Sequence, residues 1–390
     1  MPFEVIRPGV YDISVYDPDL DLFESQFEVP QGISYNSYLI VDDKVALLDT
    51  VDQRGTDQWL QNLADALQGR TPDYLIVSHA EPDHAANLAR LCGLYPGLQV
   101  VGNARTWPIL EQFFGADFLP PHRRLTVAEG DTLPLGRHCL RFIPAPFVHW
   151  PEVMVSYEVT DQILFSADAF GRFGQRDPSH LWRGEARHYY ANIVGRYAPQ
   201  VRALLQKATA LPLQAICPLH GPVLQGKDID TAVRLYTLWS SYQPEEPDTV
   251  LILHASIHGH TAAAARYARQ YLQSCGVRVR IVDLTRVRPS WVVGAAFLCG
   301  KLLLLCPTYD GELFPAMEQF LSLLKKKNYQ NRIVGLVENG SWNPCAAKLM
   351  HQQLAQMPRM ELRGPTVTLH STLTDETAAQ LRALCDALRA

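Results

Sequence analysis

The chain has 390 residues, 47% of them hydrophobic, which is enough for two packed cores, so we expect two domains. Its 35 basic and 40 acidic residues give a net charge of −5, which argues against nucleic acid as the main partner. The eight cysteines form no C-x-x-C pair, which predicts neither a fused metal knuckle nor a disulfide framework and favours a reducing, cytoplasmic location. The N-terminus has no signal-peptide pattern, and the most apolar window, 291–306, is interrupted by Gly294, Gly300 and Lys301, so no membrane segment is predicted.

The first half of the chain mixes strand-like and helix-like stretches. Residues 35–41 and 45–49 predict two strands joined by a tight turn, and a helix is expected over 56–67. Further strands are expected at 98–101 and within 124–165, and further helices near 104–114 and over 190–208 and 230–241. This order fits an αββα sandwich, in which two mixed sheets lie between layers of helices.

A polar hexapeptide, His79-Ala80-Glu81-Pro82-Asp83-His84, follows the apolar run 74–78 and precedes a helix-like segment. Alternate residues at the end of a strand lie on one side, so His79 and Glu81 can converge on one metal ion. Asp83 and His84, at the turn into the helix, can then serve a second ion nearby. The alternative is an ordinary turn in which Asp83 caps the helix and the histidines are solvated. Because a cap needs one acceptor rather than two imidazoles and two carboxylates, the hexapeptide favours a metal site.

Three further candidate ligands occupy similar positions relative to predicted strands. His149 lies just past the apolar run 140–143, Asp168 ends the run 163–168, and His220 ends the run 215–220. Taken singly, a His or Asp after a strand is more often a turn residue. The repeated placement favours a common site at the strand ends.

These motifs resemble those of the flavodiiron proteins, whose N-terminal domain has a metallo-β-lactamase-like fold. The resemblance is carried by H-x-E-x-D-H, H-W-P, L-F-S-x-D-A-F-G and H-G-P, all present here. It implies a diiron centre bridged by Asp168, with the other ligands divided between the two irons: His79, Glu81 and His149 on one, and Asp83, His84 and His220 on the other. Trp150 or Tyr190 could shape the pocket. The chain departs from the pattern at Phe173, where many relatives have a histidine.

The ligand types also favour iron over zinc. Hydrolytic di-zinc sites on this fold typically read H-x-H-x-D-H, whereas the middle position here is Glu81. Carboxylates at Glu81, Asp83 and Asp168, with no cysteine among the candidates, make a hard site that suits iron or manganese.

The second half follows a linker at 241–248, where two prolines and three acids interrupt any periodicity. From Thr249 onward, apolar runs alternate with helix-length segments, at 250–253, 277–282, 302–306, 333–337 and 366–369. Five such units predict a flavodoxin-like, doubly wound parallel sheet, which binds its ligand at the carboxyl ends of the strands. We therefore expect a metallo-β-lactamase-like diiron domain over 1–247 and a flavodoxin-like domain over 248–390.

Three loops at the predicted ligand end resemble the FMN-binding loops of flavodoxins and flavodiiron proteins. The first has hydroxyls, a glycine and a helix start that could cradle a phosphate, although it could also be an ordinary turn capped by Thr261. The other two offer an aromatic ring each, Tyr309 and Trp342, either as flavin cover or as core aromatics. The candidate FMN residues are Ser256, Ile257, His258, Gly259, His260 and Thr261, then Pro307, Thr308, Tyr309, Asp310 and Gly311, and finally Asn339, Gly340, Ser341, Trp342 and Asn343.

The resemblance implies an oxidoreductase that reduces O2 to water, NO to N2O, or both, at a non-haem diiron site. FMN would relay electrons from a small donor such as rubredoxin or a reductase. The assembly would be a head-to-tail homodimer or a dimer of dimers. Two alternatives stay open: a metallo-β-lactamase-fold hydrolase fused to a flavodoxin-like module, and a non-catalytic flavin sensor with a structural metal site.

One run of like charge, Lys325-Lys326-Lys327, ends the predicted helix 315–324. Cations at a helix C-terminus complement its dipole, which is the simpler interpretation. The alternative hypothesis is that these lysines steer an acidic electron donor towards the flavin.

Overall fold

The computed structural model describes residues 3–176 and 182–390, which divide into two compact units. The first contains the described part of Met1–Tyr190 together with Pro199–Thr237. The second contains Ala191–Ala198 and Leu238–Ala390. It therefore starts before the predicted domain limit at residue 248, and it also includes a short segment from earlier in the chain.

The first unit is built on two mixed sheets. One has the order β1-β2-β7-β8-β9-β10-β11, comprising β1 (Glu4–Arg7), β2 (Val10–Asp12), β7 (Tyr38–Val41), β8 (Val45–Leu48), β9 (Tyr74–Ile76), β10 (Gln99–Gly102) and β11 (Arg124–Thr126). The other runs from β12 to β17 in chain order, comprising β12 (Thr132–Pro134), β13 (Cys139–Pro144), β14 (Met154–Glu158), β15 (Ile163–Phe165), β16 (Ala215–Cys217) and β17 (Leu224–Gln225). Two short ladders pair β3 (Val15–Asp17) with β6 (Ile33–Tyr35), and β4 (Leu22–Phe23) with β5 (Phe27–Glu28).

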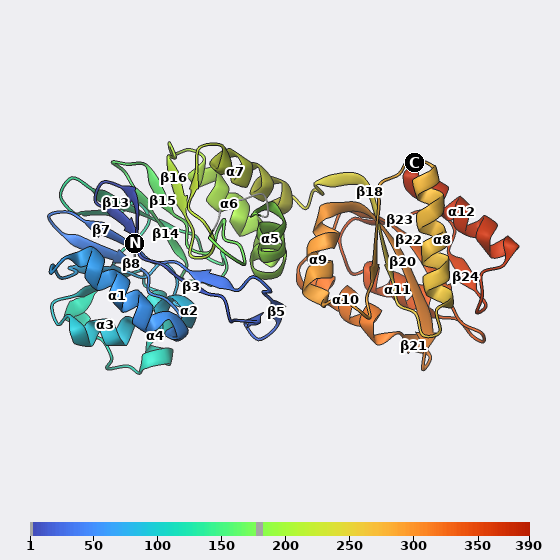
Figure 1. Ribbon diagram of the computed structural model, residues 1–390, viewed down its shortest axis with the longest axis horizontal. Coiled ribbons are helices and arrows are strands. Elements are labelled where there is room, and N and C mark those ends of the chain that lie inside the picture. Colours follow the sequence, from blue (N-terminus) through green and yellow to red (C-terminus); the bar gives the residue numbers. More distant parts are fainter. Residues whose placement is uncertain (1–2, 177–181) are drawn as a thin grey trace. The chain divides into compact units, whose positions relative to one another are not determined.

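Helices cover both outer sides of these sheets (Figure 1). One side carries α1 (Thr56–Leu67), α2 (Pro82–Ala85), α3 (Leu88–Leu94) and α4 (Thr106–Phe114), and the other carries α5 (Trp182–Tyr189), α6 (Ala198–Ala208) and α7 (Lys227–Ser240). Apolar side chains of both sheets, among them Ile40, Leu48, Phe142 and Phe165, form one buried core. The predicted αββα sandwich is confirmed.

Two predicted elements of this half differ in detail. The strand expected over 35–41 is interrupted, because Asn36 turns its amide towards the carbonyl oxygens of Pro218 and Gly221, at 2.8 and 2.7 Å. The helix expected over 190–208 is a π-helical turn over Tyr190–Val194, a 3₁₀ turn over Gly195–Tyr197, and only then α6. Pro199 lies in the first turn of α6, where its missing N–H and fixed φ favour a helix start over the continuation of a preceding helix.

The second unit is one twisted sheet with the order β19-β18-β20-β22-β23. Its parallel strands are β18 (Glu246–His254), β19 (Val279–Asp283), β20 (Cys299–Tyr309), β22 (Arg332–Asn339), β23 (Met360–Leu362) and β24 (Val367–Leu369), which also pairs with β22, while β21 (Glu312–Leu313) is antiparallel to β20. The helices are α8 (His260–Ser274), α9 (Pro289–Leu298), α10 (Pro315–Lys326), α11 (Ala346–Leu354) and α12 (Asp375–Arg389). Helix α8 packs against α12, and α10 packs against both α9 and α11. This is the predicted flavodoxin-like, doubly wound sheet.

Gly300 is required where β18 and β20 approach each other at their beginnings. A Cβ atom at this position would lie 2.1 Å from the carbonyl oxygen of Pro247, so any other residue would force the strands apart.

The lysine run lies at the end of this sheet opposite to the predicted ligand loops. Helix α10 leads away from the carboxyl end of β20, and the chain after it re-enters the sheet at Arg332, next to the beginning of β20. The Nζ atom of Lys327 donates to the carbonyl oxygen of Asn192. These positions support the interpretation of a helix ending rather than donor steering towards the predicted flavin site.

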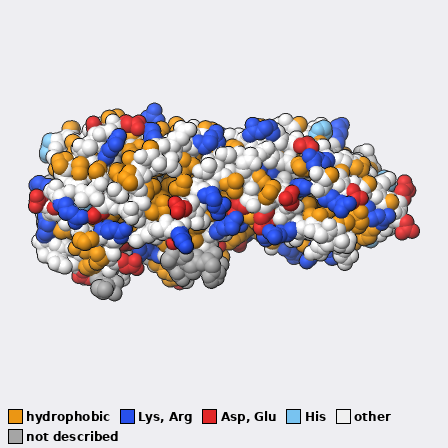
Figure 2. Space-filling view, turned by 90° about the horizontal axis from the view of Figure 1, so that it is seen from above, with side chains coloured by type: hydrophobic (Ala, Val, Ile, Leu, Met, Phe, Trp, Pro, Cys, Tyr) orange, Lys and Arg blue, Asp and Glu red, His pale blue; other side chains and the backbone are white. Residues whose placement is uncertain are grey.

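The described helices include none that is both long and apolar enough to cross a membrane. On the face shown in Figure 2, basic and acidic side chains are interspersed rather than gathered by sign. This distribution agrees with the nearly balanced charge of the sequence.

Candidate functional site

The seven predicted metal ligands converge in the first unit. Their ligand atoms form two groups, and within each group the atoms lie within 4.8 Å of one another: His79, Glu81, His149 and Asp168 in one, and Asp83, His84 and His220 in the other. Each residue lies in the segment that follows a strand of one of the two sheets. Asp83 and His84 lie within that segment in the short helix α2. The edge where the strands end therefore positions all seven side chains, as the sequence predicts.

Asp168 lies between the two groups. Its Oδ1 atom is 3.3 Å from Nε2 of His84 and 3.8 Å from Nε2 of His220. Its Oδ2 atom is 3.1 Å from Nε2 of His149 and 3.7 Å from Nε2 of His79. One carboxylate oxygen faces each group, which is the geometry that a bridging ligand needs.

Several of these buried atoms have no hydrogen-bond partner among the described residues: both carboxylate oxygens of Asp83, both ring nitrogens of His84, Oδ1 of Asp168 and Nε2 of His220. A buried polar atom without a partner costs about 1–3 kcal/mol. The same atoms lie close together, with Oδ2 of Asp83 3.2 Å from Nε2 of His84 and 3.3 Å from Nε2 of His220. Metal ions would satisfy them, so the residues fit a dinuclear centre. Three carboxylates and four imidazoles without a thiolate suit iron or manganese.

The electrostatics of the cluster are those of closely packed opposite charges. Burial raises the pKa of Asp168, but contacts with His149 and His84 outweigh this and hold that pKa well below its usual range. Burial lowers the pKa of His149, but contacts with Asp168 and Glu81 outweigh this and raise it to about 9. The anionic side chains therefore need cations beside them, as protons or as metal ions.

Three residues that were not predicted from the sequence form hydrogen bonds that hold the ligand residues in place. Glu152 Oε1 lies 2.8 Å from Nδ1 of His79, and Ser34 O lies 2.7 Å from Nδ1 of His220. Asp49 Oδ1 accepts the backbone N–H of Ser78 at 2.7 Å and that of His79 at 3.2 Å. Two signals were available, because Glu152 directly follows the H-W-P motif and Asp49 ends a predicted strand.

The aromatic surroundings differ in part from the prediction. The ring of Trp150 lies edge-on to His79, with centroids 5.2 Å apart, so it does border the cluster. Tyr190 packs against Tyr236 at 5.1 Å, whereas its neighbour Tyr189 contacts the imidazole of His220 at 5.6 Å. The hydroxyl of Tyr189 is buried and has no hydrogen-bond partner among the described residues.

Phe173 lies in an aromatic cluster rather than beside a polar partner network. Its ring is 5.6 Å from Phe23, 6.1 Å from Phe27 and 5.0 Å from both His188 and Tyr189. Aromatic rings, including one imidazole, therefore surround Phe173.

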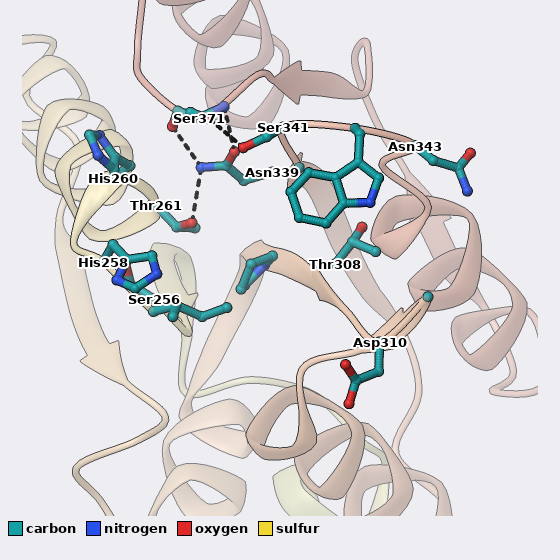
Figure 3. A pocket seen from close by; sticks show the side chains of 15 residues that line it. Ser256, His258, His260, Thr261, Thr308, Asp310, Asn339, Ser341, Asn343 and Ser371 are labelled. Atoms are coloured by element: carbon teal, nitrogen blue, oxygen red, sulfur yellow. Dashed lines mark hydrogen bonds between the residues drawn. The ribbon is translucent and has the colours of Figure 1, made fainter.

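The three predicted loops of the second unit enclose a cavity of about 470 Å³ at the carboxyl ends of the strands (Figure 3). This volume lies in the range of small-molecule and cofactor sites. The lining residues are Ser256, Ile257, His258, His260, Thr261, Pro307, Thr308, Asp310, Gly311, Asn339, Gly340, Ser341, Trp342, Asn343 and Ser371. Fourteen of these were predicted from the sequence, and Ser371 was not.

Two predicted residues do not line the cavity. Gly259 forms the turn before α8, with φ +89 and its N–H donated to Ser256 Oγ at 3.1 Å. Tyr309 packs edge-on against Phe314, with centroids 5.7 Å apart. Trp342 does line the cavity and is 83% exposed, so its interpretation as a core aromatic is wrong.

A hydrogen-bond network joins the loops on one side of the cavity (Figure 3). The Nδ2 atom of Asn339 donates to Thr261 Oγ1 at 3.2 Å and to the carbonyl oxygen of Ser371 at 2.9 Å. Ser371 N donates back to Asn339 Oδ1 at 3.0 Å. Ser371 follows the last predicted strand, so the rule used for the other loops would also have found it. The beginning of α8, which has no side-chain cap, adds free backbone N–H groups to this wall.

Comparisons with known proteins found relatives that resemble both units of this chain. Residues 33–221 match the family described as ODP family beta lactamase. The chain is 28% identical to a rubredoxin-oxygen oxidoreductase of Megalodesulfovibrio gigas, over 88% of this chain and 87% of that protein. It is 28% identical to an anaerobic nitric oxide reductase flavorubredoxin of Pectobacterium atrosepticum, over 86% of this chain and 67% of that protein.

A putative diflavin flavoprotein A 1 of Thermosynechococcus vestitus is 29% identical over 86% of this chain, which spans only 58% of the length of that relative. Among solved structures, rubredoxin oxygen:oxidoreductase from Desulfovibrio gigas superposes with a TM-score of 0.92 at 25% identity, covering 99% of this chain and 98% of that one. The similarity therefore covers both units of the fold.

Proposed function

We propose that this chain, which belongs to the flavodiiron proteins, is an oxidoreductase that reduces O2 to water, NO to N2O, or both. The observation that carries the proposal is the set of buried ligand atoms that have no partner among the described residues and divide into two groups around Asp168. The names of the relatives support both gases, since one is a rubredoxin-oxygen oxidoreductase and another a nitric oxide reductase.

The metal ligands are proposed as His79, Glu81 and His149 for one iron, Asp83, His84 and His220 for the other, and Asp168 for both. Two observations support this division: the grouping of the ligand atoms and the two-sided position of the Asp168 carboxylate. His84 belongs to this set because both its ring nitrogens are buried without a partner among the described residues.

The cavity of the second unit is proposed as the FMN site. The beginning of α8 with Ser256 and Thr261 would receive the phosphate, and the histidines beside it would add charge-assisted donors when protonated. The exposed ring of Trp342 would cover the flavin. When bound, FMN and iron would supply the redox chemistry by which electrons from a donor reach the gas.

The protein's own residues prepare the site for that chemistry. The carboxylates and imidazoles form a preformed site that is largely shielded from solvent, because His79, His84, Asp168 and His220 are each at most 2% exposed. The apolar cluster of Phe173 with Phe23 and Phe27 limits water beside His220. The hydroxyl of Tyr189, near the same imidazole, is available to donate a hydrogen bond.

We extend the proposal to partners and location. The donor would be a small redox protein such as rubredoxin or a reductase, and the protein would be cytoplasmic. It would act as a head-to-tail homodimer or a dimer of dimers, in which the flavin of one subunit serves the diiron site of the other. The name of the Megalodesulfovibrio gigas relative supports rubredoxin as the donor.

The test combines cofactor analysis with turnover. The purified protein is expected to contain two irons and one FMN per chain and to consume O2 or NO when a reductant is supplied. The rival interpretation, a hydrolase fused to a flavodoxin-like module, requires zinc and thioester or phosphoester hydrolysis. Zinc without flavin and no consumption of either gas would overturn the proposal.

A further inference from the structure

Glu152 is a buried carboxylate directly behind one proposed metal ligand. It lies in the loop before β14, and its side chain is fully buried. The Oε1 atom lies 2.8 Å from Nδ1 of His79 and accepts the backbone N–H of Ala80 at 2.9 Å. Its Oε2 atom has no partner among the described residues. Apart from the N–H of Ala80, the carboxylate is therefore directed at the ring of His79.

This contact fixes which nitrogen of His79 carries the proton. A carboxylate accepts hydrogen bonds, so the proton lies on Nδ1 and the lone pair lies on Nε2. That Nε2 atom lies 3.0 Å from Glu81 Oε2 and 3.7 Å from Asp168 Oδ2, among the other ligand atoms. Glu152 thus holds His79 in the tautomer that binds a metal.

Among the described residues, no carboxylate is hydrogen-bonded to Nδ1 of either imidazole of the second group; the buried carboxylate of Asp49 lies near His84 but accepts the backbone N–H groups of Ser78 and His79. The Nδ1 atom of His220 lies 2.7 Å from the backbone carbonyl oxygen of Ser34, which is neutral. The Nδ1 atom of His84 has no hydrogen-bond partner among the described residues. The two metal positions therefore differ in the group that is hydrogen-bonded to Nδ1 of their imidazoles, which is a carboxylate for His79 and a neutral carbonyl for His220.

We propose that Glu152 is a positioning residue that makes the two metal positions unequal, so that the iron bound by His79, Glu81 and His149 is the more easily oxidised of the pair. A carboxylate behind a histidine raises the basicity of the ring, and a more basic ligand stabilises the more highly charged metal ion. The inference rests on the proposed function, because it requires iron at both positions.

The test replaces the charge while keeping the shape. In Glu152→Gln the side-chain carbonyl oxygen can still accept hydrogen bonds from Nδ1 of His79 and from the backbone N–H of Ala80. The amide group takes the place of Oε2, which has no hydrogen-bond partner among the described residues. We expect the reduction potential of one iron to rise while that of the other is unchanged, in a redox titration of the holoenzyme followed by EPR and Mössbauer spectroscopy. Ferrous iron at that position should be retained about 10-fold less tightly against a chelator.

Glu158→Gln is the matched control. Glu158 is also fully buried, at the end of β14, but the partners of its oxygens among the described residues are the backbone N–H groups of Cys139, Thr160 and Asp161. In Glu158→Gln the side-chain amide N–H group would face the backbone N–H of Asp161, so that two donors meet. This variant should therefore lower Tm more than Glu152→Gln does and leave the reduction potentials of both irons unchanged.

The possible outcomes separate the inference from the proposed function. If the parent protein binds no pair of irons, the proposed function itself is wrong. A folded Glu152→Gln variant with both potentials as in the parent, or with both shifted equally, overturns only the inference. If that variant loses one iron completely, Glu152→Asp is measured, because it keeps the charge. A restored iron with the parent's lower potential supports the inference. An iron that is not restored overturns it.

Discussion

The proposed metal site and the proposed flavin site lie at equivalent places, the ends of strands, but they are built differently. The metal site consists of charged or ionisable side chains that are buried or, for Glu81, Asp83 and His149, exposed by no more than 18%. The flavin site is an open cavity in which backbone groups, hydroxyls and amides predominate, and its main aromatic ring, that of Trp342, is 83% exposed. A closed site concentrates its binding energy in a few side chains, whereas an open one distributes it over many groups. Single substitutions should therefore have much larger effects at the metal site.

Replacing Asp168 by Ala should give the largest effect. Its two oxygens face both groups of ligands, so the substitution removes a ligand from both metal positions. Loss of a residue behind a ligand already costs about 10–100-fold, so gas reduction should fall by more than about 100-fold. Metal analysis should show little iron, while the visible spectrum of FMN is unchanged. Full iron content in this variant would contradict the bridging role.

Replacing Glu81 by His should change the metal rather than abolish binding. The substitution gives the H-x-H-x-D-H pattern and exchanges a hard ligand for a borderline one, so the metal of the purified protein should shift from iron towards zinc. Gas reduction should be lost, because zinc is redox-inert. Metal analysis with oxygen-electrode and NO-electrode assays checks both statements, and full O2 reduction with two zincs bound would refute the iron assignment.

Replacing Trp342 by Ala should have a moderate effect, confined to the flavin site. The ring lines the cavity but is otherwise exposed, so its removal leaves the core intact. By analogy with aromatic rings that stack on nucleic-acid bases, FMN should bind about 1–3 kcal/mol more weakly. Fluorescence titration of the FMN-free protein measures this change, with iron content as the control. Unchanged FMN affinity would show that the ring does not cover the flavin.

Replacing Lys325 and Lys326 by Gln should have the smallest effect. Both lie at the end of α10, at the opposite end of the sheet from the proposed flavin site. Electron transfer from an acidic donor should therefore proceed at the parent rate at low ionic strength, and Tm should fall only slightly, by the loss of about 0.3–1 kcal/mol of helix-dipole interaction. Stopped-flow reduction by rubredoxin tests this, and a rate that falls most strongly at low salt would restore the docking hypothesis.

The sequence by itself determined the fold class and most of the residues that meet at each site. Chemically distinctive side chains, such as those of the hexapeptide 79–84, follow apolar runs that could be recognised as strands. Since strand ends gather at one edge of a sheet, the residue types and their positions after strands were sufficient to predict convergence. The same rule, applied to the last strand, would have included Ser371.

Only the tertiary structure decided what lies behind and around those residues. The contact of Glu152 with His79 and that of Ser34 with His220 join residues 73 and 186 positions apart, and no local pattern in the sequence shows that these segments meet. The π-helical turn that begins at Tyr190, and the contact of Tyr189 rather than Tyr190 with a ligand imidazole, depend on how a helix is interrupted and packed. The sequence left open whether the lysine run only ends a helix or also steers a donor, and only the direction of α10 places it at the end of the sheet away from the flavin loops. Local chemistry is encoded by residue type and strand position, but distance and direction between remote segments follow from packing, which no local pattern specifies.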